Sequence, residues 1–375
     1  MRSELLPPNG GSSVIEIGDV VTEGGVTIPS ARLRLHAFYD DANDCPTTAS
    51  TRPIILIEHA LTGDGNAIDW WSDNVGPGKP IDTERYLVLC ANVLGGCQGS
   101  TGPASLHADG KPWGSRFPGL SIRDMVQAEN QLMEKLGVEK IDSMIGASMG
   151  GARVLEWTLM FPERVTSALA IAVSARASAW QIGIQSSQIR FIEADPDWQG
   201  GDYYGTGREP NEGMGQARRI AHLTYRGELE VDERFGTEPQ RGENPYGPYR
   251  RSDQRFAVES YLDRHADKLK ERFDAGSYVV LTDALNRHDV GRGRGGMNAA
   301  LGSSQVPTMV VGVDTDILYP YHQQEHLSRN LGDFIGLSKI TSPTGHDGFL
   351  IESRQMGQVL KKFLQKAELL SEVVD

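Results

Sequence analysis

Residues 145–151 read Ile145-Gly146-Ala147-Ser148-Met149-Gly150-Gly151, which contains the pattern G-x-S-x-G. A strand-like segment, residues 141–145, precedes this pattern, and a helix-like segment that stops at Phe161-Pro162 follows it. A strand, a sharp turn and a helix form the context in which the pattern is a nucleophile elbow. Ser148 is therefore a candidate nucleophile, and the backbone N–H of Met149 is a candidate donor to a developing oxyanion. The alternative is a glycine-rich turn that carries an incidental serine.

The segments around this turn predict an α/β protein with a mostly parallel sheet covered by helices on both faces. Continuous apolar runs at residues 54–57 and 86–91 are typical of strands buried on both sides, and residues 168–173, 307–313 and 334–340 predict further strands. Alternating polarity over residues 13–39, with a Glu23-Gly24-Gly25 turn, predicts antiparallel hairpins. Ser121 and Asp124 form a capping-box pattern ahead of a helix that ends at Gly137.

Two long stretches interrupt this order of strands and helices. Residues 92–119 lack periodicity, and a long loop of this kind inside a compact domain is usually functional. Residues 178–302 contain apolar positions at helical spacing but no clear buried strand. We therefore expect a core domain made of residues 1–177 and 303–375, with residues 178–302 inserted as a helical lid.

A catalytic triad is suggested by the polar residues that follow the late strands. A serine needs a base, usually a histidine oriented by a carboxylate, and in α/β-hydrolase folds the chain order is serine, acid, histidine. Asp314 and Asp316 follow the strand at 307–313, and His346 follows the next strand. Position alone does not separate the two aspartates, and His59 competes with His346 although it precedes the serine. The loop after the strand at 54–57 offers a second oxyanion donor, the N–H of Leu61.

Composition limits the partners and the compartment. The 375 residues carry a net charge of −13, which repels nucleic acid and anionic membranes. The sequence contains no run of eighteen apolar residues, so we expect no membrane span. Three cysteines, a small and odd number, argue against a disulfide framework. Residues 1–11 lack the apolar core of a signal peptide. We therefore expect a cytoplasmic protein.

Five motifs together resemble the homoserine O-acetyltransferase family. They are residues 59–64 (HALTGD), 92–103 (NVLGGCQGSTGP), 146–151 (GASMGG), 316–320 (DILYP) and 345–348 (GHDG). The resemblance implies an α/β-hydrolase-fold enzyme of methionine biosynthesis that moves an acetyl group from acetyl-CoA to L-homoserine through an acyl-serine. It favours Asp316 as the triad acid and implies that Arg218 and Asp347 contact the acceptor. It also implies a homodimer formed through the lids, with acetyl-CoA as a co-substrate and no cofactor or metal.

The residues themselves leave several alternatives open. Arg218 can pair with the carboxylate of homoserine and Asp347 with its ammonium group, although each fits a surface ion pair equally well. The basic run at residues 287–294, which contains three arginines and His288, is a candidate for the CoA phosphates. Other open functions are a succinyl donor, a serine acceptor, a serine esterase or thioesterase, and a non-catalytic binding protein, since one fold hosts many chemistries.

Overall fold

The computed structural model describes residues 1–40, 51–249 and 251–374, and it describes side chains as far as residue 369. Cys90 and Cys97 are free thiols, whereas Cys45 lies outside the described residues. Among the helices described, none is both long enough and apolar enough to cross a membrane.

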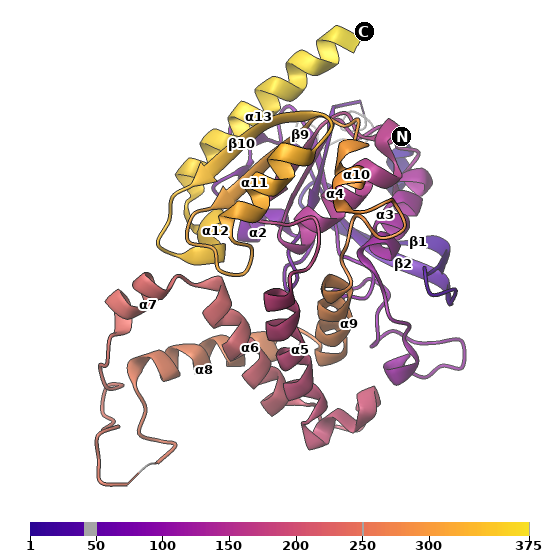
Figure 1. Cartoon of the computed structure of the whole chain (residues 1–375). Coiled ribbons are helices and arrows are strands. Elements are labelled where there is room, and N and C mark those ends of the chain that lie inside the picture. The colour runs from indigo at the N-terminus through magenta and orange to yellow at the C-terminus, as the bar shows by residue number, and fades with distance from the viewer. Residues whose placement is uncertain (41–50, 250, 375) are drawn as a thin grey trace.

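An eight-stranded sheet forms the centre of the molecule (Figure 1). Its order is β1-β2-β6-β3-β7-β8-β9-β10, and only the pairs β1/β2 and β2/β6 are antiparallel. The bounds are β1 Ser12–Val21, β2 Thr27–Phe38, β3 Ile54–Glu58, β6 Leu87–Ala91, β7 Ser143–Ala147, β8 Ala168–Ile171, β9 Thr308–Val313 and β10 Phe334–Ile340. The predicted hairpin and parallel strands are therefore confirmed. A separate two-stranded piece pairs β4 (Val75–Gly76) with β5 (Ile81–Asp82).

Every residue of β3, β6 and β7 is buried, because helices cover both faces of the sheet. One hydrophobic cluster includes side chains of α3 (Ile122–Leu136), α4 (Met149–Met160), α10 (Met297–Gly302) and α11 (Tyr321–Asn330). The other includes side chains of α2 (Ala67–Trp70), α12 (Gly348–Ile351) and α13 (Ser353–Val374). The predicted capping box of α3 is present, and Gly137 ends this helix in a left-handed conformation.

The chain between β8 and β9 forms helices, as expected from its periodicity. They are α5 Ala179–Glu193, α6 Asn211–Tyr225, α7 Glu228–Phe235, α8 Ala257–Lys270, α9 Ala275–Asn286 and α10. In Figure 1, α5 to α9 lie below the sheet, whereas α10 lies beside α11. Met214, Leu269 and Tyr278 belong to the same hydrophobic cluster as the sheet, so the insertion is packed onto the core. The division into domains at residues 177/178 and 302/303 stays a prediction.

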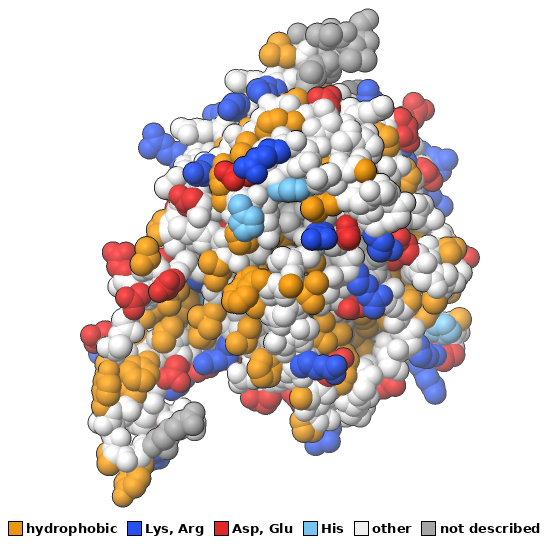
Figure 2. All heavy atoms as spheres, viewed as in Figure 1, with side chains coloured by type: hydrophobic (Ala, Val, Ile, Leu, Met, Phe, Trp, Pro, Cys, Tyr) orange, Lys and Arg blue, Asp and Glu red, His pale blue; other side chains and the backbone are white. Residues whose placement is uncertain are grey.

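Figure 2 shows hydrophobic side chains gathered over the lower part of the molecule, where the insertion lies. The large exposed apolar residues of this part of the chain are Trp180, Ile182, Phe191, Leu223, Leu229, Tyr246 and Tyr249. Scattered apolar side chains are normal on a protein surface, but a concentration on one part of it indicates contact with another molecule.

Candidate active site

Ser148 occupies the sharp turn between β7 and α4, with backbone angles of φ 56° and ψ −119°. A non-glycine residue with positive φ is uncommon and is held there by its surroundings. The backbone of the elbow packs tightly against the neighbouring strand. A Cβ atom on Gly150, two residues after Ser148, would overlap the Glu58 carbonyl group of β3. Glycine at this position therefore lets the elbow helix pass close to the neighbouring strand, which holds Ser148 at the carboxyl edge of the sheet.

His346 and Asp316 meet at the same edge from two different loops. The Nδ1 atom of His346 lies 2.6 Å from Oδ2 of Asp316, and Oδ1 of Asp316 accepts hydrogen bonds from the N–H groups of Leu318 and Tyr319, both at 2.8 Å. Asp314 faces elsewhere, since its Oδ1 accepts the Ser342 N–H at 3.1 Å. Of the two aspartates that the sequence left open, Asp316 is the one in contact with the histidine.

The electrostatics of His346 suit a general base. Burial disfavours its charged form, but the Asp316 carboxylate, its hydrogen bond and the charge of Asp347 outweigh burial and raise the pKa of His346 above its ordinary value. Because Asp316 accepts the Nδ1 proton, Nε2 is left free to accept another. Among the described residues, no hydrogen bond joins Ser148 to His346, although both line one cavity. Contacts of this kind are often long before a substrate binds.

His59, the competing histidine, has a structural role. Its Nδ1 lies 2.8 Å from the Ala60 carbonyl oxygen, and its Nε2 accepts the Val93 N–H at 3.1 Å. Burial and the positive charge of Arg153 lower the pKa of His59 to about 3. With both ring nitrogens engaged, this imidazole cannot serve Ser148 as a base.

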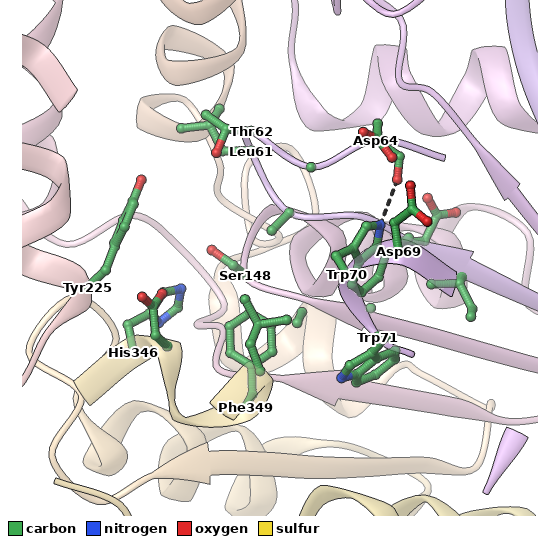
Figure 3. Close-up of a pocket in the computed structure, with 18 of the residues that line it drawn as sticks. Leu61, Thr62, Asp64, Asp69, Trp70, Trp71, Ser148, Tyr225, His346 and Phe349 are labelled. Atoms are coloured by element: carbon green, nitrogen blue, oxygen red, sulfur yellow. Dashed lines mark hydrogen bonds between the residues drawn. The ribbon is translucent and has the colours of Figure 1, made fainter. Parts of the chain in front are cut away.

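The two predicted oxyanion donors belong to two different segments of the core. Met149 is the first residue of α4, and Leu61 lies in the loop after β3. Within the described parts of the chain, neither N–H is engaged in a backbone or side-chain hydrogen bond. In Figure 3, Ser148 lies between Leu61 on one side and His346 on the other.

A cavity of about 440 Å³ surrounds Ser148 and His346. Figure 3 shows Trp70, Trp71 and Phe349 on one side of the serine and Tyr225, from the insertion, on the other. The residues that line the cavity combine aromatic walls with charged groups of both signs. The charged ones are Glu58, Asp64, Asp69, Arg218, Arg272 and Asp347.

Arg218 and Asp347 bring opposite charges into this cavity. Arg218, from α6, lies 5.4 Å over the Tyr225 ring, and its buried Nε has no hydrogen-bond partner among the described residues. Asp347 follows His346 directly, and its Oδ2 lies 3.8 Å from the Arg226 guanidinium. Burial raises the pKa of Asp347, while His346, Arg218 and Arg226 oppose that shift. A guanidinium that forms no ion pair within the described parts of the chain, together with a loosely paired carboxylate, matches a small zwitterion.

Comparison with known proteins gives the family. A family model described as alpha/beta hydrolase fold matches residues 53–353. Over 99% of its length the chain is 75% identical to a homoserine O-acetyltransferase of Corynebacterium jeikeium, and the match covers 97% of that protein. The chain belongs to the homoserine O-acetyltransferase family. The resemblance and the fold class predicted from the motifs are thereby confirmed.

Solved structures share the fold of this acetyltransferase family member at much lower sequence identity. A homoserine O-acetyltransferase from Bacillus anthracis superposes with a TM-score of 0.82 at 21% identity, over 94% of this chain and 97% of that one. Esterase E22 superposes with a TM-score of 0.82 at 23% identity, over 94% of this chain and 99% of that one. Because a transferase and an esterase fit equally well, the fold alone does not decide between transfer and hydrolysis.

The predicted role of the basic run at residues 287–294 toward the CoA phosphates stays a prediction, and the structure shows how the charges of this run are paired. Arg287 pairs with Asp283 at 2.6 Å, Arg292 with Glu23 at 2.6 Å and Arg294 with Glu156 at 2.7 Å. His288 is buried, with Nε2 3.1 Å from the Ser174 carbonyl oxygen. None of these four residues lines the cavity around Ser148. Arg292 and Arg294 pair with carboxylates far away in the chain, which the sequence could not show, whereas Arg287 pairs with a carboxylate four residues earlier.

Loop 92–119 serves the site indirectly. None of its residues lines the cavity, but the Val93 N–H donates to His59 and the Asn92 Oδ1 accepts the Gly65 N–H at 2.7 Å. Through these two hydrogen bonds the loop stabilises the segment that carries Leu61.

Sequence reasoning missed four polar residues of the insertion that line the cavity. They are His222, Tyr225, His265 and Arg272. The motifs at 223–226 (LTYR) and 272–278 (RFDAGSY) contain two of them, but nothing in either motif shows which side chains point inward. Arg272 also reaches the oxyanion loop, donating from Nη1 to the Thr62 carbonyl oxygen at 2.7 Å.

Proposed function

We propose that this chain is a homoserine O-acetyltransferase that works through an acetyl-Ser148 intermediate. The observation that carries the proposal is the shared cavity of Ser148, the His346–Asp316 pair and the oppositely charged Arg218 and Asp347. A nucleophile with its base can make an acyl-enzyme, and the two charges can hold an amino acid whose side-chain hydroxyl then attacks it.

In the first half-reaction, Ser148 Oγ attacks the thioester carbon of acetyl-CoA while Nε2 of His346 takes the hydroxyl proton. The N–H groups of Leu61 and Met149 bind the resulting oxyanion. The carbon–sulfur bond then breaks, and His346 returns the proton to the departing CoA sulfur. Acetyl-CoA is a co-substrate in this scheme, which requires no bound cofactor and no metal.

In the second half-reaction, the homoserine hydroxyl attacks the acetyl carbon while His346 takes its proton. The ester bond to Ser148 then breaks, and the proton passes to Ser148 Oγ. Arg218 binds the homoserine carboxylate, and Asp347 binds its ammonium group. These two contacts direct the hydroxyl toward the acetyl group. The positioned acceptor favours transfer over attack by water.

Hydrolysis is the second candidate function, because water can replace homoserine at the same acyl-enzyme. Measuring CoA release from acetyl-CoA with and without homoserine separates the two, and succinyl-CoA and serine test the other donor and acceptor. We expect CoA release beyond the first turnover to require homoserine, and we expect mass spectrometry to find one acetyl group on Ser148 when acetyl-CoA is present alone. In Ser148→Ala, kcat should fall by several orders of magnitude with the fold intact. Release that homoserine does not accelerate would identify a hydrolase.

We also propose that the protein is a cytoplasmic homodimer formed through the insertion. The concentration of exposed apolar side chains on residues 178–302 supports a contact there. The free thiols of Cys90 and Cys97 are compatible with a reducing compartment.

A further inference from the structure

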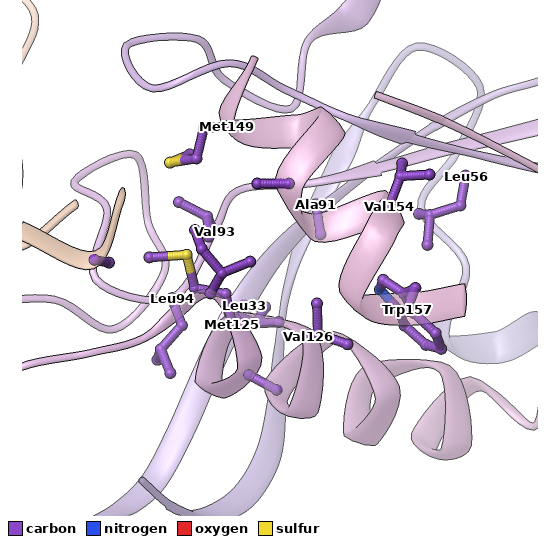
Figure 4. Packing of buried hydrophobic residues seen from close by; sticks show 14 of the residues in the cluster. Leu33, Leu56, Ala91, Val93, Leu94, Met125, Val126, Met149, Val154 and Trp157 are labelled. Atoms are coloured by element: carbon purple, nitrogen blue, oxygen red, sulfur yellow. The ribbon is translucent and has the colours of Figure 1, made fainter. Parts of the chain in front are cut away.

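A buried ion cluster lies directly behind the elbow. Arg153 of α4, Glu58 of β3 and Glu129 of α3 are each no more than 2% exposed. Nη1 of Arg153 lies 2.5 Å from Oε2 of Glu58 and 2.5 Å from Oε1 of Glu129. The indole Nε1 of Trp157 donates to the other oxygen of Glu129 at 3.0 Å, and Figure 4 shows Trp157 among the hydrophobic side chains that pack between α3 and α4.

Such a cluster is a costly way to fill a core. Removing ions from water costs several kcal/mol for each ion, and apolar residues of similar size are often at least as stabilising. Burial and then Glu129 raise the pKa of Glu58 well above its ordinary value, although Arg153 opposes that shift. General stability therefore does not explain why these three ions are buried together.

The other terminal nitrogen of Arg153 contacts the segment after β3 that carries Leu61. Its Nη2 donates to the His59 carbonyl oxygen at 2.6 Å, and His59 lies two residues before Leu61. The His59 ring is fixed in turn by Ala60 and Val93. Arg153 belongs to the first turns of the helix that begins at Met149. One guanidinium thus links the helix that carries one oxyanion donor to the loop that carries the other.

We propose that Arg153, held by Glu58 and Glu129, is a positioning residue. It fixes the position of the Leu61 N–H relative to the Met149 N–H, so that both can donate to the same oxyanion. The proposal rests on the proposed acyl-serine function. Two donors stabilise an oxyanion only if both lie about 2.7–3.1 Å from it, so the relative placement of loop and helix matters. A planar fork can bind a carboxylate with one arm and a carbonyl with the other, which the single ammonium of lysine cannot do in the same geometry.

The test is Arg153→Lys, which keeps the charge and removes the fork. Acylation is measured with p-nitrophenyl acetate, which needs neither CoA nor homoserine, and oxyanion binding is measured as the affinity for trifluoroacetone, which forms a tetrahedral adduct with the serine. We expect kcat/KM for acylation to fall about 100-fold and trifluoroacetone affinity to fall in parallel. KM for homoserine should stay within a factor of about two, because Arg218 and Asp347 are untouched.

Arg123→Lys is the matched control. Arg123 is also ion-paired and mostly buried, with Nε 3.2 Å from Glu156, but its Nη2 donates to the carbonyl oxygens of Asp289 and Arg292, away from the cavity. We expect it to lose thermal stability as Arg153→Lys does while keeping wild-type acylation and trifluoroacetone affinity.

Wild-type acylation or wild-type trifluoroacetone affinity in folded Arg153→Lys would overturn the proposal, and so would an equal loss in Arg123→Lys. If Arg153→Lys does not fold, Glu129→Gln replaces it, with an expected loss of about tenfold in both measurements, and no loss there overturns the proposal. Failure of the proposed function is seen separately, because it would leave the wild type able to react with p-nitrophenyl acetate yet unable to acetylate homoserine.

Discussion

At the scale of single residues, Asp314 and Asp316 show how neighbouring carboxylates acquire different roles. Asp316 is buried, binds two backbone N–H groups with one oxygen and faces His346 with the other. Asp314 contacts the Ser342 N–H. A triad acid must hold the histidine in the correct tautomer and stabilise the imidazolium that forms, and in this pair Asp316 alone is in contact to do so.

We therefore expect Asp316→Asn to lower kcat by about 10⁴-fold, because the amide stabilises the wrong histidine tautomer. Asp314→Asn should cost far less, since an amide oxygen can also accept the Ser342 N–H. Steady-state turnover of acetyl-CoA and homoserine measures both. Equal losses, or the reverse order, would show that the wrong carboxylate has been chosen.

The pH dependence of acylation tests the environment of His346. The base must be neutral, so kcat/KM for p-nitrophenyl acetate should fall as the pH drops through the raised pKa of His346, above its ordinary value of about 6.5. Asp347 is one of the groups that raise this pKa, so Asp347→Asn should move the acid limb to lower pH. Asp314→Asn is the control and should leave the limb in place. An upward shift in Asp347→Asn would contradict the assignment.

At the scale of elements, the acceptor site is built from two parts of the chain. Arg218 belongs to α6 of the insertion, and Asp347 ends the short 3₁₀ turn Gly345–Asp347 of the core. Tyr225, at the end of α6, contacts Arg218 through its ring, which lies 5.9 Å from that of His346. The approach of α6 to this turn therefore decides whether both charges face the same cavity.

Arg218→Ala and Asp347→Ala should impair chiefly the second half-reaction. The burst of CoA release on mixing with acetyl-CoA should survive in both, while homoserine-dependent turnover loses about 2–4 kcal/mol of transition-state stabilisation for each charged contact. Rapid-quench measurement of the burst beside steady-state turnover makes the comparison. Loss of the burst with a normal response to homoserine would mean that these residues serve the donor.

At the scale of the whole molecule, the exposed apolar residues of the insertion provide a test of the proposed dimer. Trp180 and Phe191 are 60% and 41% exposed and lie on one face of α5, three turns apart. Replacing both with aspartate should halve the mass measured by analytical ultracentrifugation without unfolding the protein. Leu106→Asp, at a residue 69% exposed outside the insertion, is the control. A double variant that sediments like the wild type would exclude this face.

Several features of this protein follow from the sequence by itself. The hairpin, the buried strands, the α3 cap and the elbow depend on neighbouring residues, through glycine geometry, side-chain period and local hydrogen bonds. The order of Ser148, Asp316 and His346, each after a parallel strand, brought the triad to one edge of the predicted sheet. The family resemblance then implied roles for Arg218 and Asp347, both of which line the cavity.

Only the tertiary structure decided which charged groups meet. Residues 58, 129 and 153 form one buried cluster although they lie on three separate elements, and Arg292 and Arg294 pair with the distant carboxylates of Glu23 and Glu156. Periodicity indicates which face of a helix is buried but not which side chain lies opposite it. Charge interactions depend on distances between segments far apart in the chain, and those distances are set by the packing of sheet, helices and insertion.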